Sequence, residues 1–496
     1  MEGSVPPPAD DSRLRTAMRL PQTARSDIAP PLGLFSRPVL RSALIIAILI
    51  SVTSSFDMFL ILNVGGNYRF CQVIAPVLIA LAILKVSCRA RLPTLGLIPL
   101  SIWLLFQCAF VSVTDFWPKS LGYCLWLLLN LAMIFSFVQL FSDTAWALNS
   151  MLRWYARSFA LIAGFGIVQF ALLLLGFPGP FVSQFSLLGN LPRANGFSYE
   201  PSYFATYLLI GFVFVGSLRR AHSVLLPPRT LLVIYWLTAI AIALSLSRMG
   251  IVFLLVDVLF AQLAPWLKVI KDLATFRIRV SKVRALAPSL VLVAGVAPLA
   301  TALTIALEHN PEVTLMLLGG TGISDTAAHS VLRREGTFEE TLTVFVEHPL
   351  IGRSLGGVSS AIADLSGIRI HSFEESKEFE GMSVFAEVLS ASGLIGFIPF
   401  CCFVIVTIRR PLKLAAESSP YYAGILRGLV RSLIFAWAIL QFNQNILRPY
   451  LWVHLAVLAS VYSAACLSAR VPVSQDGWRT ATAFAAWERT PQTPSR

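Results

Sequence analysis

Long apolar stretches separated by short polar segments dominate the hydropathy pattern of the chain. A helix needs about 20 apolar residues to cross the roughly 30 Å hydrocarbon core of a bilayer. Twelve stretches approach this length, at residues 39–62, 70–87, 95–113, 121–141, 157–177, 201–218, 230–246, 249–266, 285–307, 383–408, 424–446 and 449–468. The pattern predicts an all-α polytopic membrane protein with about twelve transmembrane helices.

The two ends of the chain differ from this apolar region. Residues 1–36 are rich in Pro, Arg and Ser, and they lack the apolar core and cleavage site of a signal peptide. Residues 469–496 end in the polar run "ERTPQTPSR". We predict that both ends are disordered and that residues 37–468 form the membrane domain.

Composition and charge support this interpretation. The chain is 56% hydrophobic and 13% charged, whereas soluble domains are about 25% charged. The net charge is +13, but the basic residues gather in alternate loops, most densely from Lys268 to Arg284. This is the positive-inside pattern, which places both termini in the cytoplasm and gives no reason to expect nucleic acid. The seven cysteines have no metal-binding or disulfide spacing, so we expect neither a metal nor another cofactor.

One predicted outer loop, residues 308–382, is far longer than a compact protein needs between two helices. Its segment "SVLRREGTFEETLTVFVEHP" predicts an amphipathic helix with Phe338, Leu342, Phe345 and Val346 on one face, ended by Pro349. The loop is expected to fold back over the membrane mouth as a lid. The alternative is a surface helix that rests on lipid headgroups.

Several arginines lie on the predicted outer face, where the positive-inside rule disfavours them: Arg193, Arg248, Arg333, Arg334, Arg353 and Arg448. Guanidinium groups bind phosphate oxygens in pairs and keep their charge, so several of them favour convergence on one anionic ligand. We expect this of Arg193, Arg248 and the Arg333/Arg334 pair. For Arg448 we favour contact with lipid headgroups.

Polar residues accompany these arginines. Glu200 immediately precedes Pro201, at the start of a predicted helix. It either interacts with the helix dipole and Arg193, or orients and deprotonates a sugar hydroxyl. Asn195 and Tyr199 would then supply hydrogen bonds to the sugar. Glu387 either joins the acceptor site or interacts with the dipole of its own helix.

Four motifs in order give the chain a resemblance to a known family. The pattern R-x-x-G-F-x-x-E-P-S-x-x-A at Arg193–Ala205 resembles the polymerases and ligases of bacterial surface polysaccharides, which include O-antigen polymerases, O-antigen ligases and exopolysaccharide polymerases. The other motifs are "LSLSRMG" at Leu244–Gly250, "RREGTFEETLTVFVEHPLIGRSLGG" at Arg333–Gly357 and "SVFAEVLSASGLIGFIPF" at Ser383–Phe400. The resemblance covers about residues 40–468.

The resemblance implies a metal-independent membrane glycosyltransferase of the GT-C type in the bacterial inner membrane. Its substrate would be a glycan linked to undecaprenyl pyrophosphate, used at the periplasmic face without a nucleotide sugar. Arg193, Arg248 and one of Arg333 and Arg334, preferably Arg334, match the arginines that hold the pyrophosphate in this family; we add Arg353 as a substrate-binding candidate. Membrane lipid and a chain-length regulator or export-complex partner are also expected as partners.

One departure from the family narrows the function. Its ligases carry an essential His near the end of the large loop, where this chain has Gly381, Met382 and Ser383. His371, about ten residues upstream, takes that role only if the loop folds differently. The departure favours a polymerase over a ligase. A lipid-linked oligosaccharide flippase and a non-catalytic export partner would also be apolar membrane proteins, but charges clustered at one face favour an enzyme over both.

Overall fold

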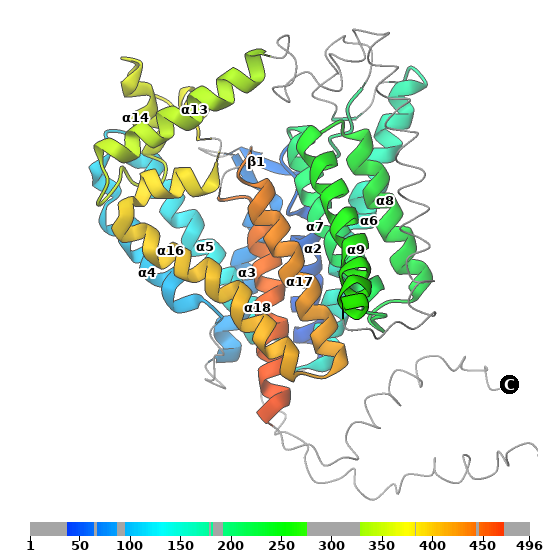
Figure 1. The fold of residues 1–496 in the computed structure, drawn as a ribbon. Helices are drawn as coiled ribbons and strands as arrows, with labels where there is room; N and C mark the ends of the chain where they lie inside the picture. The colour runs from blue at the N-terminus through cyan, green and yellow to red at the C-terminus, as the bar shows by residue number, and fades with distance from the viewer. Residues whose placement is uncertain are drawn as a thin grey trace, which may run out of the picture.

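The structure is a computed structural model, and it describes residues 37–63, 67–86, 95–177, 180–181, 192–274, 328–381, 383–442 and 446–470. It is mostly helical (Figure 1). The first elements are α2 (Arg37–Thr53), β1 (Ile61–Asn63), β2 (Asn67–Arg69), α3 (Phe70–Val86), α4 (Leu97–Ala109), η2 (Val111–Val113), α5 (Trp117–Phe141), α6 (Ala145–Leu174), α7 (Pro201–Arg220), α8 (Pro228–Leu244) and α9 (Arg248–Ala274). The later elements are α13 (Ala328–Glu347), α14 (Val358–Leu365), α15 (Phe373–Ser376), η4 (Lys377–Phe379), α16 (Val384–Glu417), α17 (Pro420–Ile439) and α18 (Pro449–Arg470).

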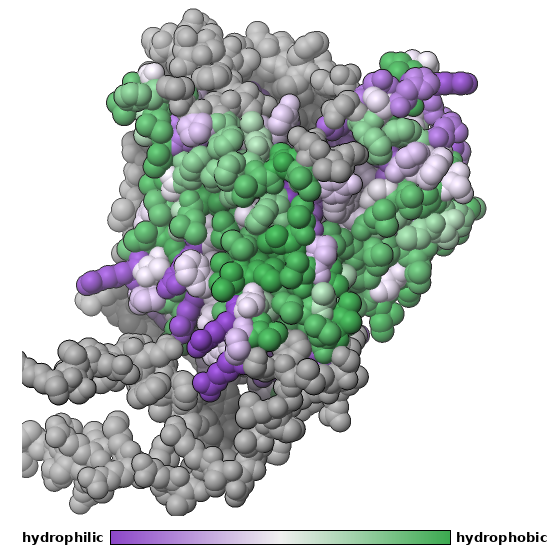
Figure 2. Space-filling model, turned by 180° about the vertical axis from the view of Figure 1, so that it is seen from behind, coloured by the Kyte–Doolittle hydropathy of each residue, from purple (hydrophilic) through white to green (hydrophobic). Residues whose placement is uncertain are grey.

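The helices suit a membrane protein. Among the described residues, the six helices α5, α6, α7, α16, α17 and α18 are long and apolar enough to cross a bilayer. The space-filling view shows a broad apolar belt with polar residues gathered above and below it (Figure 2). The predicted span at 285–307 lies outside the described residues, and a helix covers each of the other predicted stretches at least in part. The all-α membrane class is therefore supported, while the number twelve and the GT-C type stay predictions.

Helices α7, α17 and α18 form the centre of the bundle, with most of each helix buried inside the protein. A buried ion pair ties this centre to α9. The carboxylate of Asp257 is fully buried and lies 2.8 Å from the Arg431 guanidinium on α17 and 3.6 Å from that of Arg220 on α7. A carboxylate at this depth must face protein rather than lipid, and the three charges hold α7, α9 and α17 together.

The first predicted span is shorter than expected. Helix α2 ends at Thr53 instead of continuing to residue 62, and β1 pairs antiparallel with β2, with Ile61 opposite Arg69. The apolar side chains of Phe59, Leu60 and Leu62 are substantially exposed. Hydropathy counted these residues as part of a span, but the chain turns back here because Asp57 pairs with Arg69 at 2.7 Å.

The described part of the large loop contains the predicted amphipathic helix, α13, which ends two residues before Pro349. It lies over α16 at one end of the bundle (Figure 1). The predicted apolar face is partly wrong, because Phe338 is 42% and Val346 is 72% exposed. Thr341 and Val344 are buried instead, since the Ser390 hydroxyl of α16 donates to the Thr341 carbonyl and fixes the helix rotation.

Helix α16 is broken where the loop meets it. Gly393 has φ 56° and ψ −172°, a backbone conformation that only glycine adopts readily. The break frees backbone groups on both sides of it, and the turn after α13 satisfies them. The amide of Leu394 donates to the Pro349 carbonyl, and the amide of Ser354 donates to the Ala391 carbonyl. The described part of the loop, residues 328–381, is called the lid below, and the turn after α13 hydrogen-bonds it into the helix break.

Candidate functional site

The buried side-chain amide of Gln169 holds the turn from Arg193 to Glu200 in place. Gln169 of α6 accepts hydrogen bonds from the backbone amides of Asn195 and Gly196 through Oε1. Gly196 takes φ +56°, and a Cβ there would press against the Phe204 ring. The ring of Phe197 stacks on that of Phe165, with 3.9 Å between the ring centres. These contacts present Arg193 and Glu200 at the beginning of α7.

Arg193 reaches the turn that carries Arg248. Its Nε donates to the carbonyl of Ser245 at 3.2 Å, and Nη2 donates to the carbonyl of Leu246 at 3.3 Å. Arg248 begins α9 two residues later. A Cβ added at Gly250 would lie 2.7 Å from the Cβ of Ala205, so the first turns of α9 and α7 are in close contact. The structure therefore brings Arg193 and Arg248 to the same end of α7 as Glu200.

Two further arginines meet the same end of α7. The guanidinium of Arg448 lies 3.5 Å from the centre of the Tyr203 ring, one turn into the helix. Asp57 lies 3.3 Å from Arg448 and 2.7 Å from Arg69, so it bridges both cations. Arg448 is 9% exposed, and its Nε has no hydrogen-bond partner among the described residues. The expected contact of Arg448 with lipid headgroups is therefore wrong, because the side chain is buried against Asp57 and Tyr203.

Two carboxylates approach from the lid and from α16. The Glu380 Oε1 accepts from the Lys119 Nζ and from the Tyr123 hydroxyl, both at 3.3 Å. Electrostatic interactions also link Glu380 to Tyr203 and Arg448. Glu387, in the first turn of α16, is 4% exposed and carries a buried Oε2 without a hydrogen-bond partner among the described residues. The lid and α16 thus each supply one acidic group, and Glu380 acts electrostatically on Arg448.

Two polar residues predicted to contact a sugar differ in their exposure. Tyr199 is 60% exposed next to Glu200, where a ligand can reach it. Asn195 is fully buried, and its Nδ2 donates to the carbonyls of Phe181 and Ser198. A sugar contact does not fit this burial, so the prediction for Asn195 is replaced by a role in building the turn.

Three predicted arginines and one histidine lie on the lid. The Arg353 side chain donates from Nη1 to the Val113 carbonyl and lies 3.9 Å from Asp364, so its described side-chain contacts are with η2 and the lid. The backbone amide of Arg353 donates to the Ser390 carbonyl of α16. His371 is exposed, and its backbone amide donates to the Glu375 carboxylate. This hydrogen bond lowers the pKa of Glu375. Arg333 and Arg334 are on α13, but their side chains lie outside the described ones.

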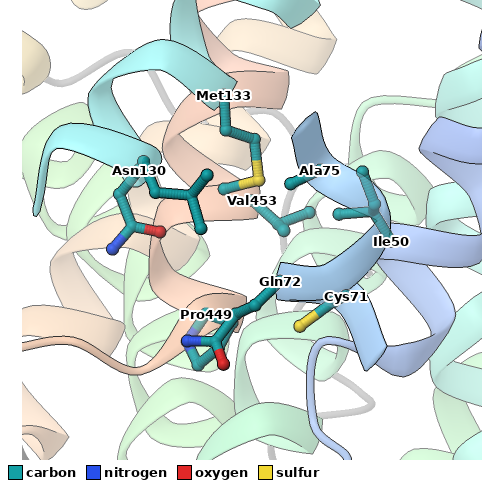
Figure 3. A pocket seen from close by; sticks show the side chains of 9 residues that line it. Ile50, Cys71, Gln72, Ala75, Asn130, Met133, Pro449 and Val453 are labelled. Atoms are coloured by element: carbon teal, nitrogen blue, oxygen red, sulfur yellow. The ribbon is translucent and has the colours of Figure 1, made fainter. Parts of the chain in front are cut away.

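Two cavities in the described structure differ in size and in lining. One, between α2, α3, α5 and α18, has a volume of about 10 Å³ and is shown in Figure 3, with Gln72 and Asn130 supplying its polar groups. It has room for about one water molecule. The second cavity, of about 160 Å³, opens beside Glu380 and is lined by Lys119, Tyr123 and Trp126 of α5. Of these two, the second is large enough for a substrate group.

Within the described ranges no three His, Cys, Asp or Glu side chains gather as metal ligands. The chemistry that the site offers is that of guanidinium groups, carboxylates and aromatic rings.

Comparison with known proteins assigns the chain to no family. No protein-family model matches the chain, and neither does any curated protein. The fold and the site define a helical membrane protein with cationic groups gathered at one end of α7, and the family resemblance of the motifs stays an expectation.

The sequence analysis missed Asp57, Arg69, Lys119 and Glu380 as members of the site. A usable signal was present for Arg69 and Lys119, because both are basic residues on the predicted outer face. Lys119 is only 4% exposed. Its position in a short outer loop would instead predict an exposed side chain. Asp57 carried only the general signal of a carboxylate inside a predicted span, which must face protein, and nothing in the sequence identified Arg69 and Arg448 as its partners.

Proposed function

We propose that this protein is a membrane glycosyltransferase that polymerises lipid-linked repeat units of a surface polysaccharide at the outer face of the bacterial inner membrane. The observation that carries the proposal is the gathering of Arg193, Arg248 and Arg448 around the beginning of α7, next to Glu200. The positive end of the α7 dipole points to the same place. This arrangement suits a ligand with a compact double negative charge, such as a pyrophosphate.

In the proposed reaction, a hydroxyl oxygen of the acceptor sugar attacks the anomeric carbon of the donor glycan. The bond from that carbon to the pyrophosphate oxygen breaks, and its electron pair leaves with undecaprenyl pyrophosphate. The arginines neutralise the charge that develops on the departing oxygen, which is most effective in a preorganised and partly dehydrated site. Glu200 orients the attacking hydroxyl and accepts its proton, and a single displacement inverts the anomeric carbon.

The buried pairing of Arg448 with Asp57 supports different roles for the arginines at this end of α7. Asp57 already balances part of the charge of Arg69 and Arg448. Arg193 donates to the carbonyls of Ser245 and Leu246, in the turn that leads into Arg248. Because that turn places Arg193 and Arg248 side by side at the beginning of α7, we assign the pyrophosphate chiefly to these two arginines, with Arg334 joining them from the lid.

Arg248→Ala tests the proposal. Removal of one preorganised cation from a transition state typically lowers the rate about 10²–10³-fold. A deletion strain that produces this variant should accumulate single repeat units on the lipid carrier while the protein is still present in the membrane. Arg229→Ala, on the exposed inner end of α8, is the matched control and should restore full-length polymer. Polymer of normal length from Arg248→Ala would remove the arginine from the mechanism.

The glycans of the deletion strain distinguish a polymerase from a ligase and from a flippase. Single repeat units indicate a polymerase, free lipid-linked polymer indicates a ligase of the same family, and lipid-linked units trapped on the cytoplasmic face indicate a flippase. A deletion strain that shows none of these three changes in its glycans would contradict all three functions.

A further inference from the structure

The cavity beside Glu380 joins the lid to the bundle and has the composition of a carbohydrate site. Its volume is about 160 Å³, which has room for several water molecules or one sugar ring. The residues that matter here are Lys119, Tyr123, Trp126, Phe373, Lys377 and Glu380. Sites for small organic ligands typically combine aromatic walls with a few fixed polar groups, as this cavity does.

The aromatic walls are incompletely covered by protein. Phe373 is 51% exposed although its ring packs against Phe116 at 5.3 Å. Trp126 is half-buried and contacts the Tyr68 ring edge-on at 5.6 Å. Such faces leave apolar area that the protein does not cover and that a ligand can cover. The C–H faces of a sugar ring fit such a wall, while its hydroxyl groups need polar partners.

Glu380 supplies a polar partner in a fixed position. Both contacts that described residues make to its carboxylate fall on Oε1, from Lys119 and Tyr123. Its side chain is still 35% exposed, which leaves Oε2 for a ligand hydroxyl. Lys119 also donates to the Ser359 hydroxyl and the Ser376 carbonyl, so its three ammonium hydrogens are all used within the protein. Lys119 therefore positions Glu380 and does not itself bind the ligand.

The carboxylate of Glu380 favours a neutral hydroxyl-bearing ligand over an anion at its position in the cavity. The ammonium of Lys119 is balanced by Glu380 at 3.3 Å, and Lys377, the other ammonium in the lining, is exposed. An anion placed against Glu380 would meet its carboxylate, whereas a hydroxyl group can donate to it. Glu380 also acts electrostatically on Arg448 and Tyr203, which belong to the cationic end of α7.

We infer that this cavity is a binding subsite for a neutral sugar ring, with Glu380 accepting a hydrogen bond from a ring hydroxyl and Trp126 and Phe373 covering the faces of the ring. That the bound ring belongs to the acceptor chain rests on the proposed function. In that case the subsite holds the acceptor next to the pyrophosphate, and Lys119 acts as a positioning residue for Glu380.

Sugar binding to the purified full-length protein in detergent tests the subsite directly. The probes are methyl glycosides of a neutral hexose, an N-acetylhexosamine and a hexuronic acid, and the readout is the intrinsic tryptophan fluorescence. At least one of the two neutral glycosides should give a saturable change that disappears in Trp126→Phe. Glu380→Ala should weaken the affinity about tenfold, the effect of one lost hydrogen bond to a charged group. Phe373→Ala should weaken it by up to about tenfold, because it removes an aromatic contact with the ring face. The hexuronide should bind more weakly than the neutral sugars.

Two controls separate this inference from the proposed function. Glu347→Gln changes an exposed carboxylate at the end of α13 and should leave binding unchanged. Arg248→Ala should also bind the glycoside normally, because it alters only the cationic centre. Absence of a saturable change with both neutral glycosides, or an equal change in Trp126→Phe, overturns the subsite even if Arg248→Ala abolishes polymerisation. Normal sugar binding together with normal polymer in Arg248→Ala overturns the proposed function and leaves the subsite in place.

Discussion

At the scale of single residues, Asp57 is the group on which the cationic end of α7 depends. It is the shared partner of Arg69 and Arg448, and the exposed fractions of the Asp57 and Arg448 side chains are 9% and 11%. A buried arginine that loses its counter-charge keeps its own charge, because a guanidinium does not deprotonate in a protein. The carboxylate thus permits a cation to be buried at the bundle end.

We predict that Asp57→Ala destabilises the protein by about 3 kcal/mol, the usual effect of removing one partner from a buried ion pair. Thermal unfolding in detergent measures the change. The double variant Asp57→Ala with Arg448→Met should recover part of the loss, because it no longer buries an uncompensated charge. Asp364→Ala removes the partly exposed pair with Arg353 and should change stability by less than about 1 kcal/mol. Equal losses in Asp57→Ala and Asp364→Ala would contradict this assignment.

Individual residues also show what the sequence does and does not reveal. A carboxylate within an apolar helix must face protein, and Asp257 does so because Arg431 and Arg220 balance its charge. Arg448 was misassigned because the sequence contains no sign that Asp57, nearly 400 residues away, lies against it. Contacts between distant segments have no local pattern to reveal them.

At the scale of elements, the junction between the lid and α16 is the most constrained part of the structure. Leu394 and Ile395 donate their amides to the carbonyls of Pro349 and Leu350, respectively. In a continuous helix these amides would donate to carbonyls four residues earlier in α16. The break at Gly393 therefore makes the junction possible. Glycine in "SASGLIG" is visible in the sequence, but a helix pattern there predicts an unbroken span.

Gly393→Ala should separate the lid from the bundle. A side chain at this φ and ψ costs about 1–3 kcal/mol, and its Cβ would overlap the Leu350 backbone. We expect faster trypsin cleavage at Arg353 and a lower Tm. Gly164→Ala, in α6, is the matched control because no atom lies within 4 Å of its added Cβ. That variant should be neutral or slightly stabilised. Unchanged cleavage in Gly393→Ala would show that the turn docks without the helix break.

At the scale of the whole molecule, the two ends of the bundle differ in what they carry. One end holds α13 and α14 of the lid, and the opposite end holds the connection from α7 to α8 (Figure 1). The polar margins of the molecule flank an apolar belt that fits a bilayer (Figure 2). The distribution of basic residues predicts that the lid end faces the periplasm.

Cysteine labelling in intact cells tests this orientation. In a variant whose seven native cysteines are replaced by serine, Tyr199→Cys should react with a maleimide that crosses the outer but not the inner membrane. Arg229→Cys, exposed at the beginning of α8, should react only after the inner membrane is permeabilised. The reverse pattern would place the candidate site in the cytoplasm and contradict the proposed lipid-linked substrate.

The amino-acid sequence by itself determined the membrane class, the approximate places of the helices, the existence of α13 and the start of α7 at Pro201. These features follow from local properties, namely apolar length, periodicity, and the positions of Pro and Gly. Only the tertiary structure decided that Arg448 and Asp57 are buried together, that α13 presents Thr341 and Val344 inward, and that Glu380 borders a cavity. Each of these depends on a contact between segments far apart in the chain, whose energy no single stretch of sequence contains.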